Sequence, residues 1–234
     1  VKKYKIIVEP AKKNTAPAIL SSTLIKDIPN EQCLMFFPAD HLVEKLSLFN
    51  KAINKNKHHL TDQNIFIFGI KPSEPSSEYG YFLTKKNKTN MNKVTKFIEK
   101  PNKAKAKQII KKKAYWNAGM FFVRKDSIIN NFKKYQPNIY RNCVKSVSKA
   151  KLINHTYYLN KDSFIKITSK SFDYAVLEKS KQINAIKLNI PWSDLGSWRE
   201  ISKIYKKNKA KYFKKKNIHY RPWGRYVNLF EGQN

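Results

Sequence analysis

The stretch from residue 34 to residue 41, LMFFPADH, constrains the fold more than any other part of the chain. The apolar run that begins at Cys33 predicts a strand covered on both faces, as in the sheet of an α/β protein. Pro38 ends that strand at a turn, and Asp40 follows at once. A carboxylate just past a buried strand lies where open α/β sheets bind ligands, and it can hold a divalent metal. Alternatively, Asp40 caps a helix that starts near Leu42, and both roles stay open.

Strand-like and helix-like segments alternate along the chain, which predicts an α/β fold. Apolar or alternating runs predict strands at residues 4–8, 64–70, 94–100, 115–123 and 183–190. Helical spacing and capping residues predict helices from Asn14 to before Pro29, from about residue 42, over 102–113, over 126–148 with a break at Pro137, and over most of 162–179.

Four polar or flexible residues stand out within or beside these predicted strands. Gly80 lies between two aromatic residues, which indicates either an ordinary turn or a place where a ligand or another backbone approaches closely. Glu99 and Lys100 end a strand just before a proline. Asn117 interrupts an apolar run, so its amide must find a partner in the backbone or in a ligand.

Two further aspartates occupy positions where capping is the simplest explanation. We expect Asp173 to cap the short helix that follows it rather than to serve in catalysis. Asp194 follows the last predicted strand and precedes a helix predicted from Ser197, so it too could be a cap. However, a shared metal would require two strand-end carboxylates such as Asp40 and Asp194, although spacing alone does not bring them together.

Composition limits the class of protein. The 234 residues predict one domain by default, and 41% hydrophobic residues are too many for a disordered chain. No apolar run approaches the ~20 residues that span a bilayer, and Cys33 and Cys143 offer no disulfide framework, which together predict a cytoplasmic protein without membrane contact. The net charge of +32 comes from lysines spread over the whole length. We attribute this charge to an AT-rich coding sequence, which favours lysine codons, rather than to nucleic-acid binding. The lysine cluster at 203–216 keeps nucleic-acid binding open as an alternative.

Eight motifs in this order resemble the bacterial mannose-1-phosphate guanylyltransferases that carry an added phosphomannose-isomerase-like domain. They lie at Glu9–Pro10 with residues 14–19, at 38–41, 68–70, 79–81, 97–101, 116–121, 173–176 and 192–198. The resemblance implies a Rossmann-like nucleotide-diphospho-sugar transferase fold, with a mixed, mostly parallel sheet flanked by helices. It also implies the transfer of a guanylyl group from GTP to mannose 1-phosphate, giving GDP-mannose and pyrophosphate.

The same resemblance assigns roles to single residues. Asp40 and Asp194 would hold Mg²⁺, and Lys100 would contact the sugar phosphate. Three residues that would line the mannose are Gly80, Glu99 and Asn117. The four residues that would face guanine are Glu9, Asn14, Thr15 and Ala16. A nucleotidyltransferase for another sugar 1-phosphate remains an alternative, and homo-oligomerisation is left open.

The resemblance also implies that both ends are incomplete. The family has a glycine-rich loop that would precede Val1, so we expect an N-terminally incomplete domain over residues 1–202 with reduced or no activity alone. Residues 203–217 would form a lysine-rich linker, and residues 218–234 would begin a cupin domain at the segment RPWG.

Overall fold

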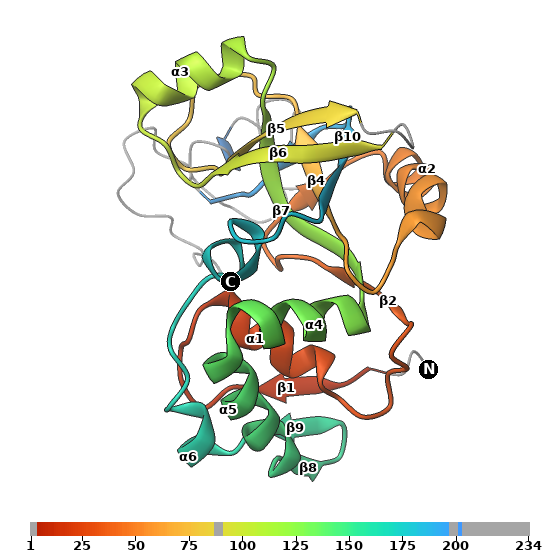
Figure 1. The fold of residues 1–234 in the computed structure, drawn as a ribbon, viewed down its shortest axis with the longest axis vertical. Helices are drawn as coiled ribbons and strands as arrows, with labels where there is room; N and C mark the ends of the chain where they lie inside the picture. Colours follow the sequence, from red (N-terminus) through yellow and green to blue (C-terminus); the bar gives the residue numbers. More distant parts are fainter. Residues whose placement is uncertain (1–3, 87–90, 197–200, 203–234) are drawn as a thin grey trace, which may run out of the picture. The chain divides into compact units, whose positions relative to one another are not determined.

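A six-stranded sheet forms the centre of the computed structural model, which describes residues 4–86, 91–196 and 201–202 (Figure 1). Its strands in spatial order are β2 (Cys33–Phe36), β7 (Tyr115–Arg124), β4 (Ile65–Ile70), β10 (Ile183–Leu188), β6 (Asn92–Ile98) and β5 (Tyr81–Lys86). The α/β class and the mixed sheet are confirmed. The expectation of a mostly parallel sheet is wrong, because only β4 and β10 pair in parallel among the described strands of this sheet. The long strand β7 runs opposite to β2, β4 and β5, its three neighbours.

Helices cover both faces of the sheet at β4, all of whose residues are buried. Successive side chains of a strand point to opposite faces, so Ile65 and Ile67 share one face and Phe66 and Phe68 share the other. The first face meets α1 (Thr15–Thr23), α4 (Lys125–Tyr135) and α5 (Pro137–Ser148), which lie together in Figure 1. On the second face, the ring of Phe49 in α2 (Leu46–Asn56) packs 5.1 Å from that of Phe68.

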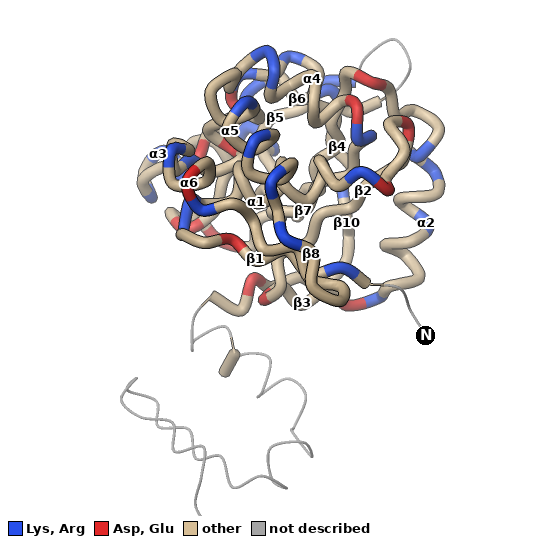
Figure 2. Tube along the Cα trace, turned by 90° about the horizontal axis from the view of Figure 1, so that it is seen from below, with Lys and Arg blue, Asp and Glu red and all other residues tan. Residues whose placement is uncertain are grey.

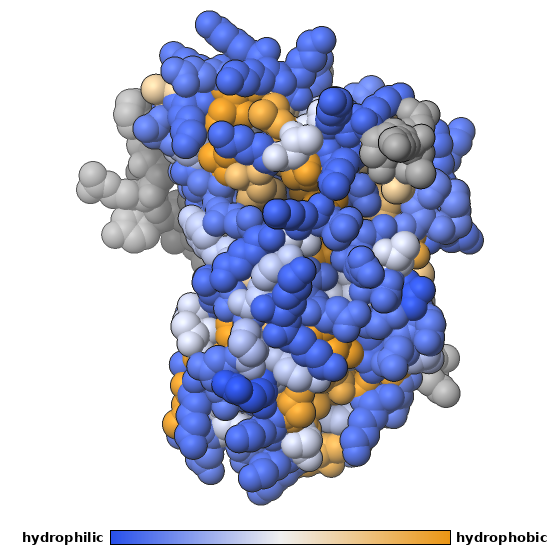
Figure 3. Space-filling model, in the orientation of Figure 1, coloured by the Kyte–Doolittle hydropathy of each residue, from blue (hydrophilic) through white to orange (hydrophobic). Residues whose placement is uncertain are grey.

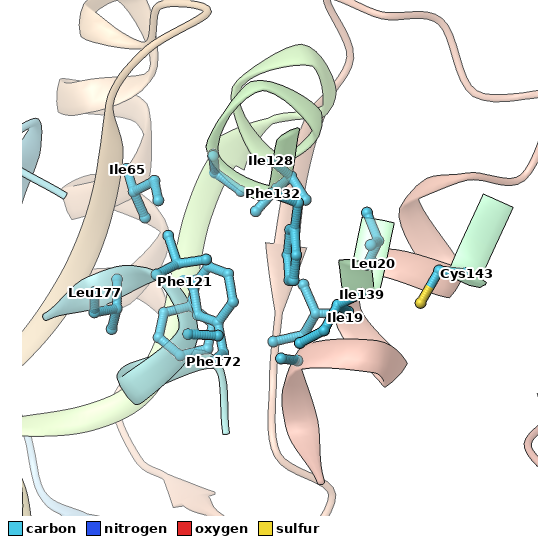
Figure 4. Packing of buried hydrophobic residues seen from close by; sticks show 14 of the residues in the cluster. Ile19, Leu20, Ile65, Phe121, Ile128, Phe132, Ile139, Cys143, Phe172 and Leu177 are labelled. Carbon is cyan, nitrogen blue, oxygen red and sulfur yellow. The ribbon is translucent and has the colours of Figure 1, made fainter. Parts of the chain in front are cut away.

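Three phenylalanines join these helices to the sheet (Figure 4). The ring centroid of Phe172 lies 4.7 Å from that of Phe121 in β7 and 6.0 Å from that of Phe132 in α4. Phe132 and Phe172 are fully buried, and burial of such a side chain contributes ~1.5–3 kcal/mol. This packing fixes the segment around Phe172 against the sheet. The same segment lines a cavity.

Several predicted features of the helices are confirmed. Asn14 is the N-cap of α1, and its side chain accepts a hydrogen bond from the amide of Thr15. Asn102 likewise caps α3 (Lys103–Lys111). Pro137 separates α4 from α5 by occupying the first turn of α5, where its missing N–H is not needed.

The strand that begins at Cys33 differs from its prediction. β2 lies at the edge of the sheet, its last three residues are half-buried and Cys33 is exposed. An apolar run shows that a strand is at least partly covered, but it does not fix the strand's place in the sheet. Residues 42–43 form the short strand β3 rather than the start of a helix, and α2 begins only at Leu46 after Lys45. Asp40 therefore caps no helix.

Smaller elements complete the main unit, which comprises residues 1–38 and 45–190. A second sheet contains β1 (Ile6–Val8), β9 (Thr156–Tyr158) and β8 (Lys151–Ile153). The remaining short helices are η1 (Lys57–His59), α6 (Lys161–Phe164) and η2 (Asp173–Leu177), a single π-helical turn. Residues 162–179 were predicted to be mostly helical. They contain only α6 and η2, so this prediction is right only in part.

A second unit combines residues 39–44 with the chain from residue 191 onward. Within it, β3 pairs antiparallel with β11 (Trp192–Ser193). The predicted linker and cupin segment, and the helix predicted from Ser197, lie outside the described residues except for 201–202.

Positive charge is spread over many elements of the described chain and is not gathered on one helix or loop (Figure 2). The face seen in Figure 3 is largely hydrophilic, with small hydrophobic areas between the polar side chains. Within the described ranges, none of the helices has the length and apolar character needed to span a bilayer.

Candidate functional site

Three of the predicted sugar-binding residues meet at one end of the sheet. The amide of Asn117, in β7, donates a 2.8 Å hydrogen bond to the carbonyl oxygen of Gly80. A Cβ atom added to Gly80 would lie 2.5 Å from Oε2 of Glu99, so the glycine leaves room for this carboxylate. Gly80 therefore lies where another group, the Glu99 carboxylate, approaches the backbone closely. This is one of the two roles that its aromatic neighbours indicated. The structure brings Gly80, Glu99 and Asn117 together although they come from three different segments.

Hydrogen bonds join the turn at the start of α1 to residues 170–172. The backbone amide of Ala16 donates to the carbonyl oxygen of Lys170 at 3.1 Å, and the amide of Phe172 donates to Oγ1 of Thr15 at 2.9 Å. Asn14 itself has a positive φ of 66°, a conformation that asparagine tolerates better than most residues. Its side chain and that of Thr15 thereby stand beside the loop that leads into η2.

A cavity of about 630 Å³ brings Glu99 together with Asn14 and Thr15, whereas Gly80 and Asn117 do not themselves line it. Its lining comes from the start of α1, the turn after β6 and the segment around η2, namely Asn14, Thr15, Glu99, Lys100, Ser169, Lys170, Ser171, Asp173, Tyr174, Glu178 and Lys179. The volume is that of a small-ligand site, for which ~300–1,000 Å³ is usual. Asn14 and Thr15, predicted for the base, and Glu99 and Lys100, predicted for the sugar phosphate, thus line one space.

Charged groups of both signs line this cavity. Lys100, Lys170 and Lys179 supply ammonium groups, and Lys100 holds a positive φ of 40° in the turn after β6. The carboxylates belong to Glu99, Asp173 and Glu178. Such a lining can bind a ligand that carries both an anionic group and hydroxyl groups.

Two of these carboxyl groups are unusually easy to protonate. Burial, together with the negative charge of Asp173, raises the pKa of Glu99 to about 7, and the positive charge of Lys100 opposes this. Burial likewise raises the pKa of Asp173. Hydrogen bonds from its own backbone amide and from the Asn117 side chain lower this pKa, but burial outweighs them. Groups with displaced pKa values that converge in a cavity mark candidate functional sites.

Asp173 is the residue whose role was wrongly predicted. The N-cap position of η2 is Phe172, and the amide of Tyr174 bonds to the hydroxyl of Ser171 instead. The carboxylate of Asp173 accepts a 2.9 Å hydrogen bond from Nδ2 of Asn117. The signal that could have revealed this contact is Asn117 itself, because a polar side chain within a buried strand requires a partner.

Glu9 and Ala16 do not line the cavity. Ala16 is fully buried in α1 and supports the wall only through its backbone amide. Burial raises the pKa of Glu9, and its Oε1 atom is buried without a hydrogen-bond partner among the described residues. Its negative charge acts on Cys143 in α5, whose thiol pKa rises to about 12, mainly because of burial. The role of Glu9 toward the base therefore stays a prediction.

The two predicted metal ligands belong to the second unit. Ser193 pairs with Leu42 in the ladder of β11 and β3, so Asp194 and Asp40 both lie just beyond one end of it. The Asp40 carboxylate lies 3.9 Å from Nε2 of His41, and that of Asp194 accepts a hydrogen bond from the amide of Gly196. The ladder brings the two aspartates to neighbouring positions, which the spacing in the sequence did not show.

The donor set of this pair suits magnesium. In the part of the chain that the structure describes, no group of three or more His, Cys, Asp or Glu side chains could by itself hold a metal ion. Mg²⁺, however, commonly uses one or two carboxylates and completes its coordination with water and substrate phosphates. Asp40 and Asp194 fit that pattern, and their role as ligands remains a prediction.

Comparison with known proteins agrees with the fold and the motifs. A family model described as nucleotidyl transferase matches residues 2–211. A mannose-1-phosphate guanylyltransferase of Escherichia coli is 34% identical over 214 residues, which cover 88% of this chain and 46% of that protein. The chain thus spans about half the length of the curated relatives that it matches. These relatives bear the name of the family that the sequence motifs resemble.

Two crystal structures share the fold. One, described as mannose-6-phosphate isomerase from Helicobacter pylori, superposes with a TM-score of 0.71 at 29% identity, covering 80% of this chain and 74% of the other. The second, described as mannose-1-phosphate geranyltransferase from Thermus thermophilus, has a TM-score of 0.73 at 24% identity and covers 85% and 57%. The second similarity shows the fold alone.

Proposed function

The chain belongs to the nucleotidyl transferase family, and on this premise we propose that it forms the sugar-phosphate site, and one side of the nucleotide site, of a mannose-1-phosphate guanylyltransferase. The reaction would join GTP and mannose 1-phosphate into GDP-mannose and release pyrophosphate. The observation that carries this proposal is the single cavity lined by both Asn14 and Thr15 and by Glu99 and Lys100.

The lysines that line the cavity suit a sugar phosphate. An ammonium group is a compact countercharge for a phosphate, and three lysines line this space. We assign the phosphate of mannose 1-phosphate to Lys100, with Lys170 and Lys179 as further countercharges. Lysines carry only hydrogen-bond donors, so acceptors for the O–H groups of the sugar must come from other residues of the lining.

The carboxylates that line the cavity suit sugar hydroxyl groups. The carboxylates of Glu99 and Asp173 can accept hydrogen bonds from hydroxyl groups, and Asn117 holds Asp173 in place from β7. Gly80 leaves the space that Glu99 needs. Asn14 and Thr15, at the start of α1, would stand on the nucleotide side of the same cavity.

Catalysis in such a site depends mainly on position. The phosphate oxygen of the sugar attacks the α-phosphate of the nucleotide in line, and a protein accelerates this step by holding the reactants and neutralising charge. Asp40 and Asp194 would hold Mg²⁺, which when bound supplies charge neutralisation at the phosphates. The described residues of the cavity bind and orient the sugar phosphate.

The test is to measure by calorimetry how the chain binds mannose 1-phosphate and GTP, with Lys100→Ala as the variant. A charge-assisted contact is worth ~1.5–3 kcal/mol, so the affinity for mannose 1-phosphate should fall about 10- to 100-fold. Lys103→Ala is the matched control, because Lys103 is an exposed lysine of α3 that does not line the cavity. GTP affinity should change little in either variant.

The opposite pattern would remove the basis of the assignment. If Lys100→Ala abolished GTP binding and left mannose 1-phosphate unaffected, the sugar phosphate would bind elsewhere. A panel with ATP, CTP, UTP and dTTP, and with glucose 1-phosphate, distinguishes a guanylyltransferase from a nucleotidyltransferase for another sugar. Preference for a pair other than GTP and mannose 1-phosphate would favour that alternative.

A further inference from the structure

A second cavity, of about 580 Å³, lies beside β6 and borders the first. Residues 93–97 of β6 line one side of it, and residues 177–181 with Ile183 line the other. It shares Glu178 and Lys179 with the first cavity, but none of the other residues assigned to the sugar phosphate. The proposed function leaves this space without a role.

The lining of this cavity shows that it follows the edge of β6. Side chains of a strand alternate between its two faces, so a cavity lined by five consecutive residues must run along the edge, where the backbone groups lie. β5 pairs with the opposite edge of β6, including Val94, Lys96 and Phe97. β10 pairs with β6 only at Asn92 and Lys93. Among the residues that the structure describes, no other strand pairs with this edge over residues 94–97.

Lysines surround this open edge. Lys93 and Lys96 lie on β6, and Lys179 and Lys181 lie on the facing segment, all four of them exposed. Glu178 is the acidic residue that lines the same cavity. The cavity therefore combines an excess of positive charge with backbone groups that none of the described strands pairs with.

We propose that this cavity binds an extended acidic peptide segment of a partner protein, which adds as a strand to the open edge of β6. Backbone hydrogen bonds would supply affinity, and contacts of alternate acidic side chains with the lysines would set the register of the segment. Five strand residues extend over about 17 Å, so a segment of similar length is sufficient. A second copy of this chain is a poor occupant, because its net charge of +32 opposes close approach.

The simplest competing explanation is that the lysines only protect the edge. Exposed strand edges often carry lysines that prevent unwanted pairing, and such an edge would bind no peptide. A small polyanion such as inorganic triphosphate would use the lysines but not the backbone of β6. The experiment must therefore separate the contribution of charge from that of backbone pairing.

The experiment measures fluorescence anisotropy of a labelled eight-residue peptide with alternating Glu and Val, mixed with the whole chain. A peptide of the same sequence, N-methylated at alternate residues, retains the charge and loses the backbone donors of one edge. We expect it to bind about tenfold more weakly, since each backbone hydrogen bond contributes modestly. The double variant Lys93→Gln/Lys181→Gln should bind the unmodified peptide about fivefold more weakly, as expected for exposed ion pairs.

The matched control is Lys103→Gln/Lys107→Gln, which removes the same charge from exposed positions on α3. It should change the affinity less than about twofold, as expected for distant screened charges. Hydrogen exchange of the β6 amides should slow when the peptide binds. Absence of binding, equal binding of the N-methylated peptide, or an equal loss in the α3 control would each overturn the proposal. Equal binding of the N-methylated peptide with displacement by inorganic triphosphate would indicate a small-polyanion site instead.

Discussion

The side-chain amide of Asn117 donates a 2.9 Å hydrogen bond to the carboxylate of Asp173, and this contact joins β7 to η2. Asn117 is 8% exposed, so the bond forms largely away from water. The same residue bonds through its backbone to Gly80. Asn117 thus holds Asp173, which lines the cavity, and Gly80, which leaves room for Glu99, from within the sheet, which is a positioning role.

Asn117→Ala should destabilise the chain at neutral pH. The substitution leaves the Asp173 carboxylate without its amide partner, and an unsatisfied buried group costs ~1–3 kcal/mol. It should also raise the pKa of Asp173 further, because the Asn117 side chain lowers it. Urea denaturation of the wild type, both single variants and the double variant with Asp173→Asn measures the coupling between the two residues. Additive effects would show that the bond contributes nothing.

Gly80→Ala should alter ligand binding more than stability. The added Cβ would meet Oε2 of Glu99, the far end of a flexible side chain that can move away. The displaced carboxylate should weaken the binding of mannose 1-phosphate, as calorimetry would reveal. Gly69→Ala is the contrasting variant, because its Cβ would lie 2.5 Å from the fully buried ring of Phe82. That variant should lower the melting temperature markedly, and the reverse ranking would contradict both assignments.

Glu99 should make the stability depend on pH. Its pKa is about 7 in the folded chain against an ordinary value of 4.5, so between these values the folded chain holds a proton that the unfolded chain has released. This contribution to stability is complete below about pH 4.5 and is lost as the pH rises through about 7. Because Glu99 is only half-buried, we expect a loss of about 1 kcal/mol.

Glu99→Gln should remove this dependence. Urea denaturation at pH 5, 6, 7 and 8 should show a shallower decline in the free energy of unfolding for the variant than for the wild type. Glu31→Gln, at an exposed position between α1 and β2, serves as the control. The raised pKa of Asp173 acts in the same direction, so some decline should persist in Glu99→Gln. Identical curves for the variant and the wild type would rule out the raised pKa of Glu99.

Asp40→Asn and Asp194→Asn should each weaken the binding of a divalent cation. Mn²⁺ replaces Mg²⁺ at oxygen-ligand sites and is detected directly by electron paramagnetic resonance, so the test does not depend on activity. The chain with GTP should bind Mn²⁺ more tightly than either variant does. Asp62→Asn removes an exposed carboxylate elsewhere and should have no effect. Unchanged binding in both aspartate variants would refute the proposed metal site.

The sequence predicted the local structure better than the place of each strand. The runs at β4 and β7 were identified because a strand buried on both faces must be apolar throughout, and the caps at Asn14 and Asn102 follow from side chains that bond nearby amides. The edge position of β2 could not be predicted, because apolar character alone does not tell which strands are its neighbours.

The site was predicted in part for a similar reason. Glu99, Lys100 and Asn117 could be predicted from their immediate sequence, because the first two end a strand and the third is a polar residue in an apolar run. Asp173 carried only the sign of a cap, because its true partner is 56 residues away in the sequence. Glu9 is close to the Asn14 turn in sequence, but it does not line the cavity, and its buried Oε1 atom has no hydrogen-bond partner among the described residues.

The hydrogen bonds between the turn before α1 and the loop before η2 make the geometry of each segment depend on the other. The amide of Lys170 bonds to the carbonyl oxygen of Lys13, the amide of Ala16 bonds back to Lys170, and the hydroxyl of Thr15 accepts from Phe172. A residue without a hydroxyl at position 15 would leave the Phe172 amide unpaired, directly beside Asp173. Under the proposed function, a substitution in the turn that altered nucleotide binding would therefore also disturb the segment that holds Asp173 for the sugar.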